Sequence, residues 1–459
     1  MQLPEELLQD IAECIAYDTV FAERQMPKLR WKYSTTELLC LSIANHQLRR
    51  ICFPFLFSCV EVELNDLKKL TDLCADNEKF ALSIRALNLE NTSRELRDET
   101  TDGIGCLLNH LKHLLQLNLT SIWLDNPLLT VINSHPVPSV IVSDINFCDA
   151  ELLSKLGPGQ LAKFLFNVAA FYDENGRNEL EAYSPSGAQV RQLNISRADR
   201  LQDSIRTWTL HGLCELRLNL ERRPTSLSWI PEFACANPLL QKICFTASFS
   251  SMVNVLHDPT IPFIKSFVEE AYEAGLNHDL TIKGFAITRH RGSTVLALGD
   301  LREWYVSGLH LIIPEWSSGR LLHIAHSLFP QISVLTIGNL SAPFDELVTA
   351  LGRFSSLQIV NFDRPPRFLL GFGKQSPDHA EMEAAMMQYT SCIAQRIPSI
   401  EAFYILALED KESWLQGWLN VQTFRTRHTI GPLHRHIFRS REKTYPRQSS
   451  KYYNFVLLV

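Results

Sequence analysis

The stretch LKHLLQLNL, residues 111–119, places Leu114, Leu117 and Leu119 in the spacing LxxLxL. Because side chains alternate across a strand, the second and third of these leucines face one side and the residue between them faces the other. A short strand with one apolar face cannot bury that face alone, whereas a stack of such strands, each returning through a helix or loop, makes a continuous core. The stretch therefore predicts one unit of a repeating fold.

Related triplets recur along most of the chain at steps of roughly 23 to 30 residues, which overlaps the range of leucine-rich repeats. The clear copies are Ile84, Leu87 and Leu89; Leu213, Leu216 and Leu218; Leu240, Ile243 and Phe245; Ile332, Leu335 and Ile337; and Leu357, Val360 and Phe362. The weaker copies are Val137, Val140 and Val142; Val190, Leu193 and Ile195; Ile282, Phe285 and Ile287; Val306, Leu309 and Leu311; and Ile400, Phe403 and Ile405. Chance triplets in a chain that is 46% hydrophobic, or the buried strands of an ordinary α/β domain, are the alternatives.

We therefore expect the α/β fold class: a short three-helix module at the N-terminus, followed by an irregular leucine-rich-repeat solenoid with a curved parallel sheet. The expected domains are residues 1–62, residues 63–410, and a basic cap or tail over residues 411–459. The length of 459 residues accommodates a small module joined to a long solenoid.

The composition indicates which binding partners and which cellular compartment to expect. The chain has 44 Lys plus Arg against 50 Asp plus Glu, a balance that indicates neither a nucleic acid nor an anionic membrane as partner. Its 11 cysteines include no CxxC pair, which argues against a disulfide framework and a zinc module. The N-terminus is acidic rather than basic and no apolar run reaches the roughly 20 residues of a spanning helix. We expect a protein of the cytoplasm or nucleus that is not secreted.

The N-terminal region predicts helices over residues 3–16, from Thr35 or Thr36 onward, and from near Gln47 to Pro54, with residues 17–34 as an inserted loop. The opening Leu3, Pro4, Glu6, Leu7 and Ile11, together with TELLCLSIANHQLRRICFPFLFSCVEV over residues 36–62, resembles the F-box, and specifically the F-box proteins of filamentous and mushroom-forming fungi. In that family the helices dock on a Skp-type adaptor, which links to a cullin and a RING subunit. The resemblance implies adaptor contacts by Leu3, Pro4, Leu7, Leu8, Ile11, Leu38, Leu41, Ile51 and Pro54. The alternative is that residues 1–62 only cap the open end of the solenoid.

Polar residues that alternate with the apolar triplets are the candidates for binding a protein substrate, because a row of them one repeat apart makes a long concave surface. Each of them also fits an ordinary solvated strand position. They are Gln116, Asn118, Gln192, Asn194, Glu215, Arg217, Lys242, His310, Thr336, Asn361 and Tyr404.

No pattern predicts catalysis, a metal or a cofactor. The pairs His110 with His113 and His434 with His436 lack further ligands at a suitable spacing. The glycines of GFGK, residues 371–374, and the pair Gly103 and Gly105 are interpreted as turns rather than phosphate loops. We expect the non-catalytic substrate-recognition subunit of a cullin–RING ubiquitin ligase. The alternatives are a leucine-rich-repeat scaffold without a ligase link and, ranked below it, a hydrolase with a scattered triad.

Overall fold

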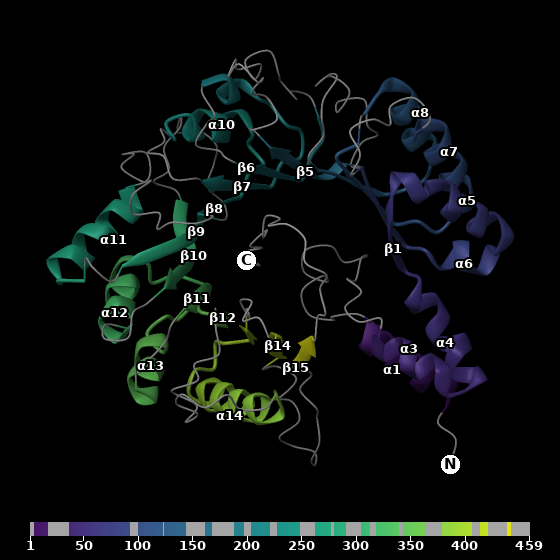
Figure 1. The fold of residues 1–459 in the computed structure, drawn as a ribbon. Coiled ribbons are helices and arrows are strands. Elements are labelled where there is room, and N and C mark those ends of the chain that lie inside the picture. Colours follow the sequence, from purple (N-terminus) through teal and green to yellow (C-terminus); the bar gives the residue numbers. More distant parts are fainter. Residues whose placement is uncertain are drawn as a thin grey trace. The chain divides into compact units, whose positions relative to one another are not determined.

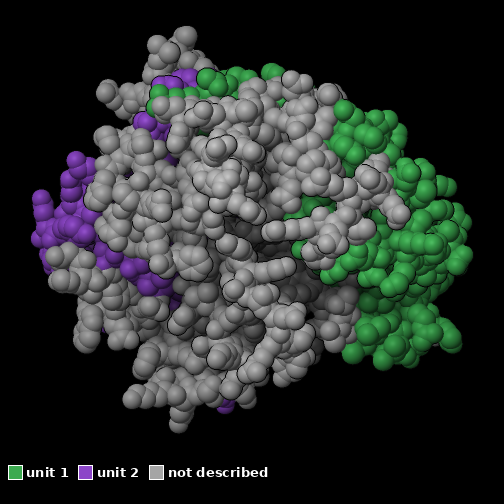
Figure 2. All heavy atoms as spheres, turned by 45° about the horizontal axis from the view of Figure 1, so that its top comes forward, with its two compact units in different colours: residues 1–196, 202–216, 236–240 green, residues 197–201, 217–235, 241–459 purple. Residues whose placement is uncertain are grey.

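The helices and strands of the chain are seen in a computed structural model (Figure 1). The structure describes residues 4–16, 36–91, 100–122, 124–143, 161–167, 188–196, 203–220, 227–247, 262–276, 280–290, 304–312, 318–338, 343–362, 379–405, 414–420 and 438–441. Two compact units divide the chain, drawn in green and purple in Figure 2. The first comprises residues 1–196, 202–216 and 236–240, and the second residues 197–201, 217–235 and 241–459. The boundary thus lies inside the region 63–410 that the sequence predicts as one repeat array.

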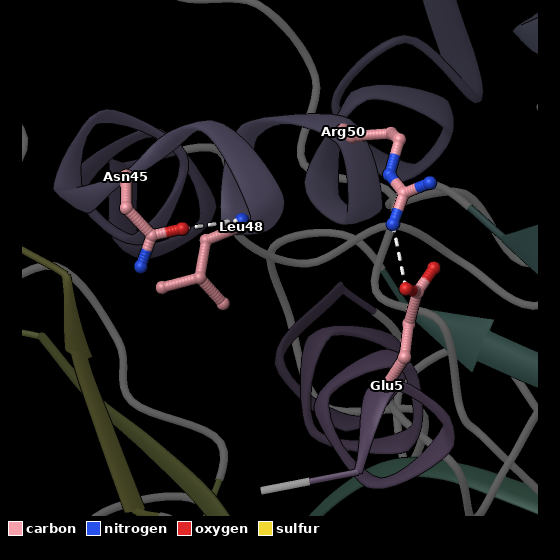
Figure 3. Close-up of polar contacts among 4 residues, drawn as sticks. All are labelled: Glu5, Asn45, Leu48 and Arg50. Atoms are coloured by element: carbon pink, nitrogen blue, oxygen red, sulfur yellow. Dashed lines mark hydrogen bonds and ion pairs between the residues drawn. The ribbon is translucent and has the colours of Figure 1, made fainter. Parts of the chain in front are cut away.

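Three helices open the first unit: α1 (Glu5–Ala16), α3 (Thr36–Ala44) and α4 (His46–Leu56). Asn45 separates α3 from α4, and its side-chain oxygen accepts a hydrogen bond from the Leu48 N–H at 2.8 Å, which caps α4 (Figure 3). An exposed ion pair of 2.6 Å joins Glu5 of α1 to Arg50 of α4 (Figure 3). The three helices share a small core of Ala12, Ala16, Leu38, Ile51 and Cys52.

Parallel strands follow in chain order: β1 (Cys59–Glu63), β2 (Ala86–Glu90), β3 (Gln116–Thr120), β4 (Ser139–Ser143), β5 (Leu161–Asn167) and β6 (Gln192–Ser196). The repeated triplets align in register, so that Leu87 of β2 pairs with Leu117 of β3 and Leu117 pairs with Val140 of β4. All three side chains are fully buried. The prediction that the triplets form the buried face of paired parallel strands is confirmed here.

Short helices connect these strands: η1 (Leu64–Asp66), α5 (Leu67–Asp76), α6 (Glu78–Ser83), α7 (Thr100–His110) and α8 (Asn126–Ser134). Figure 1 shows α5, α7 and α8 on one side of strands β1 to β4. Gly103 and Gly105 lie inside α7, so the interpretation of this pair as a turn is wrong. A Cβ at Gly103 would lie 2.8 Å from Leu67 Cδ2, and one at Gly105 would lie 3.4 Å from Val131 Cγ2. The glycines therefore let α7 approach α5 and α8 closely.

A buried asparagine closes the last part of the first unit, after the short helix η5 (Asp203–Thr207). The Asn237 Oδ1 atom accepts a hydrogen bond of 2.7 Å from the Leu210 N–H, and its Nδ2 donates one of 2.9 Å to the Trp208 carbonyl. Asn237 is 1% exposed and follows helix α10 (Ile230–Ala236). The boundary between the two units passes within strand β7 (Glu215–Leu220).

The strands of the second unit are β8 (Lys242–Ala247), β9 (Thr281–Arg289), β10 (Trp304–Ile312), β11 (Val334–Gly338), β12 (Ile359–Phe362), β13 (Ala402–Ile405), β14 (Trp414–Asn420) and β15 (Phe438–Arg441). Strands β10 to β13 pair in parallel, but β9 is antiparallel to both β8 and β10. Strands β14 and β15 also pair antiparallel. The expectation of a parallel sheet over residues 63–410 is therefore wrong at β9. The segment 411–459, predicted as a basic cap or tail, contains the paired strands β14 and β15. The apolar alternation in β9 is the same in either strand direction, so it could not reveal the reversal.

Helices α11 (Pro262–Glu273), α12 (Ser318–Leu328), α13 (Phe344–Leu351) and α14 (His379–Arg396) complete the second unit. Its core is rich in aromatic pairs between neighbouring strands. The rings of Phe245 and Phe285 stack at 4.4 Å between centroids, and those of Phe362 and Phe403 stack at 6.2 Å. In this unit, every triplet residue whose side chain the structure describes is buried. In both units we call the side of the sheet that alternates with the buried triplets the open face.

Candidate functional site

Exposed apolar side chains gather on the first two N-terminal helices. Leu7 and Ile11 of α1 are 48% and 43% exposed, and Leu39 and Ile43 of α3 are 54% and 65% exposed. Among the described residues three more large apolar side chains are exposed, each on a different part of the chain: Leu73, Leu239 and Tyr272. We call Leu7, Ile11, Leu39 and Ile43 the apolar helix surface. Exposed apolar side chains gathered in this way are typical of surfaces that bind a partner, which makes the apolar helix surface a candidate site.

The helical spacing explains why these side chains point outward. Leu7 and Ile11 stand four residues apart, so they form one stripe, about 100° around the helix from the stripe of Leu8 and Ala12. Ala12 is fully buried and Leu8 packs against the same core. Because the small alanine lets α1 lie close to its neighbours, the core is complete without the outer stripe. The apolar face of α1 is therefore wider than the module itself needs.

Helix α3 repeats this arrangement. Leu38 and Ser42 are buried, while Leu39 and Ile43 form the adjacent stripe, again four residues apart. The sequence TELLCLSIA is apolar around most of the helix, so periodicity could not decide which leucine faces outward. This is why sequence reasoning missed Leu39 and Ile43. Their spacing of four residues was the available signal.

The residues predicted to contact an adaptor differ in their exposure: some are exposed, some are half-buried and some are buried. Pro4, Leu7, Ile11 and Pro54 are exposed, and Leu8 and Leu41 are half-buried. Leu38 and Ile51 are 0% and 6% exposed and lie in the core of the helices themselves, so the expectation that they anchor a partner is corrected: they hold the module together. Leu3 and the inserted loop 17–34 lie outside the described residues.

The predicted polar row lies on the open face, and in the first unit its amides bond to one another. Gln116 Nε2 donates a 2.6 Å hydrogen bond to Asn118 Oδ1, and Asn118 Nδ2 donates to Asn88 Oδ1 on β2. Gln192 Nε2 donates to Asn194 Oδ1 at 2.8 Å on β6 in the same way. Gln116 is only 2% exposed, so the expectation that it is displayed is wrong.

In the second unit three members of the polar row are buried. His310, Thr336 and Asn361 are register partners on β10, β11 and β12, with exposures of 6%, 1% and 4%. Asn361 Nδ2 donates a 2.9 Å hydrogen bond to Thr336 Oγ1. These three residues are therefore not displayed as predicted. The remaining members are half-buried Glu215, Arg217 and Lys242, and Tyr404, whose side chain lies outside the described residues.

The described residues also bear on metal sites, membrane-spanning helices and the histidine pairs of the sequence. There, no three or more His, Cys, Asp and Glu side chains gather as a metal site would require. Among the described helices none combines the length and apolar character needed to cross a membrane. His113 Nδ1 lies 3.3 Å from the Leu82 carbonyl oxygen, a local structural contact, and His434 and His436 lie outside the described residues.

Comparison with known proteins gives a weak structural likeness. No protein-family model matches the sequence, and no curated protein is similar to it in sequence. A solved structure that the chain resembles is the leucine-rich repeat-containing protein LegL7 from Legionella pneumophila, with 12% sequence identity and a TM-score of 0.33. The similarity covers 75% of this chain and 90% of that chain.

Proposed function

We propose that the chain is an F-box-like substrate-recognition subunit of a cullin–RING ubiquitin ligase of the type found in fungi. The observation that carries this proposal is the apolar helix surface on α1 and α3. Its members Leu7 and Ile11 belong to the segment that resembles the F-box, and they are exposed as a docking residue must be. The strands and helices that follow would form the turns of a leucine-rich-repeat solenoid that holds the target.

The apolar helix surface has enough area to contribute substantially to binding. Fully burying one exposed Leu or Ile side chain contributes roughly 1.5 to 3 kcal/mol. Because these four are already about half-buried, together they give about 3 to 6 kcal/mol before the costs of association. Those costs are estimated at about 4 kcal/mol or more. The four side chains therefore need support from neighbouring contacts, for which exposed Pro4 and Pro54 are available.

Such a subunit makes and breaks no bonds itself. It holds a lysine of the target near the enzyme that carries ubiquitin, which converts a bimolecular encounter into an effectively intramolecular one. Tethering of this kind gives effective concentrations of about mM. The open face of the sheet, with the amides of Asn88, Asn118 and Asn194, would supply polar contacts to the target. The subunit would work in the cytoplasm or nucleus, where we place the ligase.

The test is capture of a purified fungal Skp-type adaptor by the full chain and its variants. We expect Leu7→Asp to weaken capture by at least about tenfold, because it removes one buried side chain and places a charge in an apolar contact. The double variant Leu7→Asp with Ile11→Asp should capture none. The matched control is Leu73→Asp, since Leu73 has the same 48% exposure as Leu7 but belongs to α5 and not to α1 or α3.

Circular dichroism and thermal unfolding of each variant establish that the chain remains folded. Full capture by the folded double variant would show that the apolar helix surface does not dock an adaptor. Absence of capture by the unmodified chain would also contradict the proposal. In that case a repeat scaffold without a ligase link, or a cap that merely closes the sheet, would be favoured instead.

A further inference from the structure

The paired strands β9 and β10 of the second unit each contain one β-bulge. His310 pairs with Gly284 and Leu311 pairs with Ile282, so Lys283 is an extra residue in β9. Val306 pairs with Ile287 and Gly308 with Ala286, so Ser307 is an extra residue in β10. Bulges of this kind change the direction in which a side chain points and are common beside functional sites.

His310 lies between these two bulges, and its environment is unusual for a buried polar side chain. It is 6% exposed, and its Nε2 atom has no hydrogen-bond partner among the residues that the structure describes. The residue opposite it on β9 is Gly284, which presents no side chain. Buried polar groups in folded proteins nearly always have partners, so an unpartnered one needs an explanation.

Thr336, the register partner of His310 on β11, offers a second donor. Its Oγ1 accepts the hydrogen bond from Asn361 Nδ2, which leaves the hydroxyl proton available to donate elsewhere. Thr336 is 1% exposed, so this proton does not point into bulk water. His310 and Thr336 thus place two hydrogen-bonding groups next to each other on the open face.

Lys283 adds a positive charge to the same place. It is half-buried and forms no ion pair with any residue that the structure describes. The register places Lys283 next to Gly284, the partner of His310. Burial, and then the positive charge of Lys283, lower the pKa of His310 to about 4. Strands β8 to β12 contain no Asp or Glu that could compensate this charge.

We propose that Lys283, His310 and Thr336 form a binding site for an oxyanion, a carboxylate or a phosphate group. The ammonium group supplies the charge, and the imidazole N–H and the threonine hydroxyl supply directed hydrogen bonds. Gly284, opposite His310, contributes no side chain to the site. The site belongs to the second unit and does not depend on adaptor binding by α1 and α3.

The experiment uses the full chain and inorganic phosphate as the probe. Calorimetry should show saturable binding, and NMR of the His310 imidazole should show its pKa rising when phosphate is present, because a nearby negative charge favours the protonated ring. Acetate titrated in parallel separates a carboxylate site from a phosphate site. Peptides carrying glutamate or phosphoserine between alanines show whether the anion is accepted on a protein chain or only as a free ion.

Matched variants localise the binding. Lys283→Met should weaken phosphate binding by about tenfold, which corresponds to about 1.4 kcal/mol. Lys283→Arg should retain most of it, and Lys68→Met on exposed α5 removes the same charge without affecting binding. Thr336→Val provides a second test should Lys283→Met fail to fold.

Three results would overturn the proposal. The first is no saturable binding of either phosphate or acetate by the unmodified chain. The second is equal weakening by Lys68→Met and Lys283→Met, which would indicate only a general charge effect. The third is a His310 pKa that does not move when the anion binds.

Discussion

Replacing Asn237 by alanine should destabilise the first unit more than any exposed substitution. Asn237 accepts from the Leu210 N–H and donates to the Trp208 carbonyl, so the variant removes the acceptor of a buried N–H and one donor to a buried carbonyl. A buried group left without its partner costs roughly 1 to 3 kcal/mol, and the second lost bond about 1 kcal/mol more. We therefore expect the free energy of unfolding to fall by about 2 to 4 kcal/mol.

The assay is urea unfolding followed by tryptophan fluorescence, since Trp208 is 1% exposed and lies beside the substituted residue. The midpoint should move to lower urea with an unchanged slope, because the unfolded surface area is the same. Asn109→Ala, an exposed asparagine on α7, is the control and should change stability little. A loss of less than about 0.5 kcal/mol in Asn237→Ala relative to this control would refute the reasoning, since it would show that the two bonds contribute nothing net.

Three further predictions concern single residues. Gly105→Ala should raise the free energy of unfolding by about 0.5 to 1 kcal/mol through helix propensity. Gly103→Ala should be about 1 kcal/mol less stable than Gly105→Ala, because its Cβ meets Leu67. Thermal unfolding of the two variants measures this difference. The lowered pKa of His310 means that the unfolded chain binds more protons, so stability should be full above pH 6.5 and fall towards pH 4, by up to about 1.4 kcal/mol per pH unit; urea midpoints in His310→Gln should lose this dependence. Burial raises the pKa of the Cys74 thiol to about 11, so mass spectrometry after iodoacetamide treatment should find exposed Cys40 modified and Cys74 protected.

The buried faces of the strands could be predicted from the sequence because alternation is local. Whether Leu117 points inward depends on its own strand and not on which strand lies beside it. The register of neighbouring strands could be predicted as well, since alignment of the triplets in the sequence pairs Leu87 with Leu117, as the structure does. Strand direction is different in kind. It depends on the path of the connection, and the triplet of β9 carries no information about that path.

Solvent exposure was harder to predict than the face of the strand or helix on which a residue lies. Thr336 and Asn361 alternate with buried residues as expected, yet both are buried, because exposure depends on neighbours contributed by distant parts of the sequence. On α3 the difficulty was the opposite one. Leu38 and Leu39 are adjacent and equally apolar, and only packing against α1 and α4 decides that Leu38 is inside and Leu39 outside. A local pattern predicts which face a residue lies on, whereas packing determines what remains accessible.

The proposed oxyanion site lies where the repeat pattern fails, and this has a physical reason. In a regular repeat, polar residues at the variable strand position become neighbours by register, as Asn88 and Asn118 do, and they satisfy one another. The bulge at Lys283 adds one residue that the pattern does not contain, so its charge arrives beside His310 without a matching group on the next strand. A polar group unpaired for this reason cannot be compensated by the repeat itself. A ligand from outside the repeat would satisfy it, which is why departures from local consistency are the places to look for function.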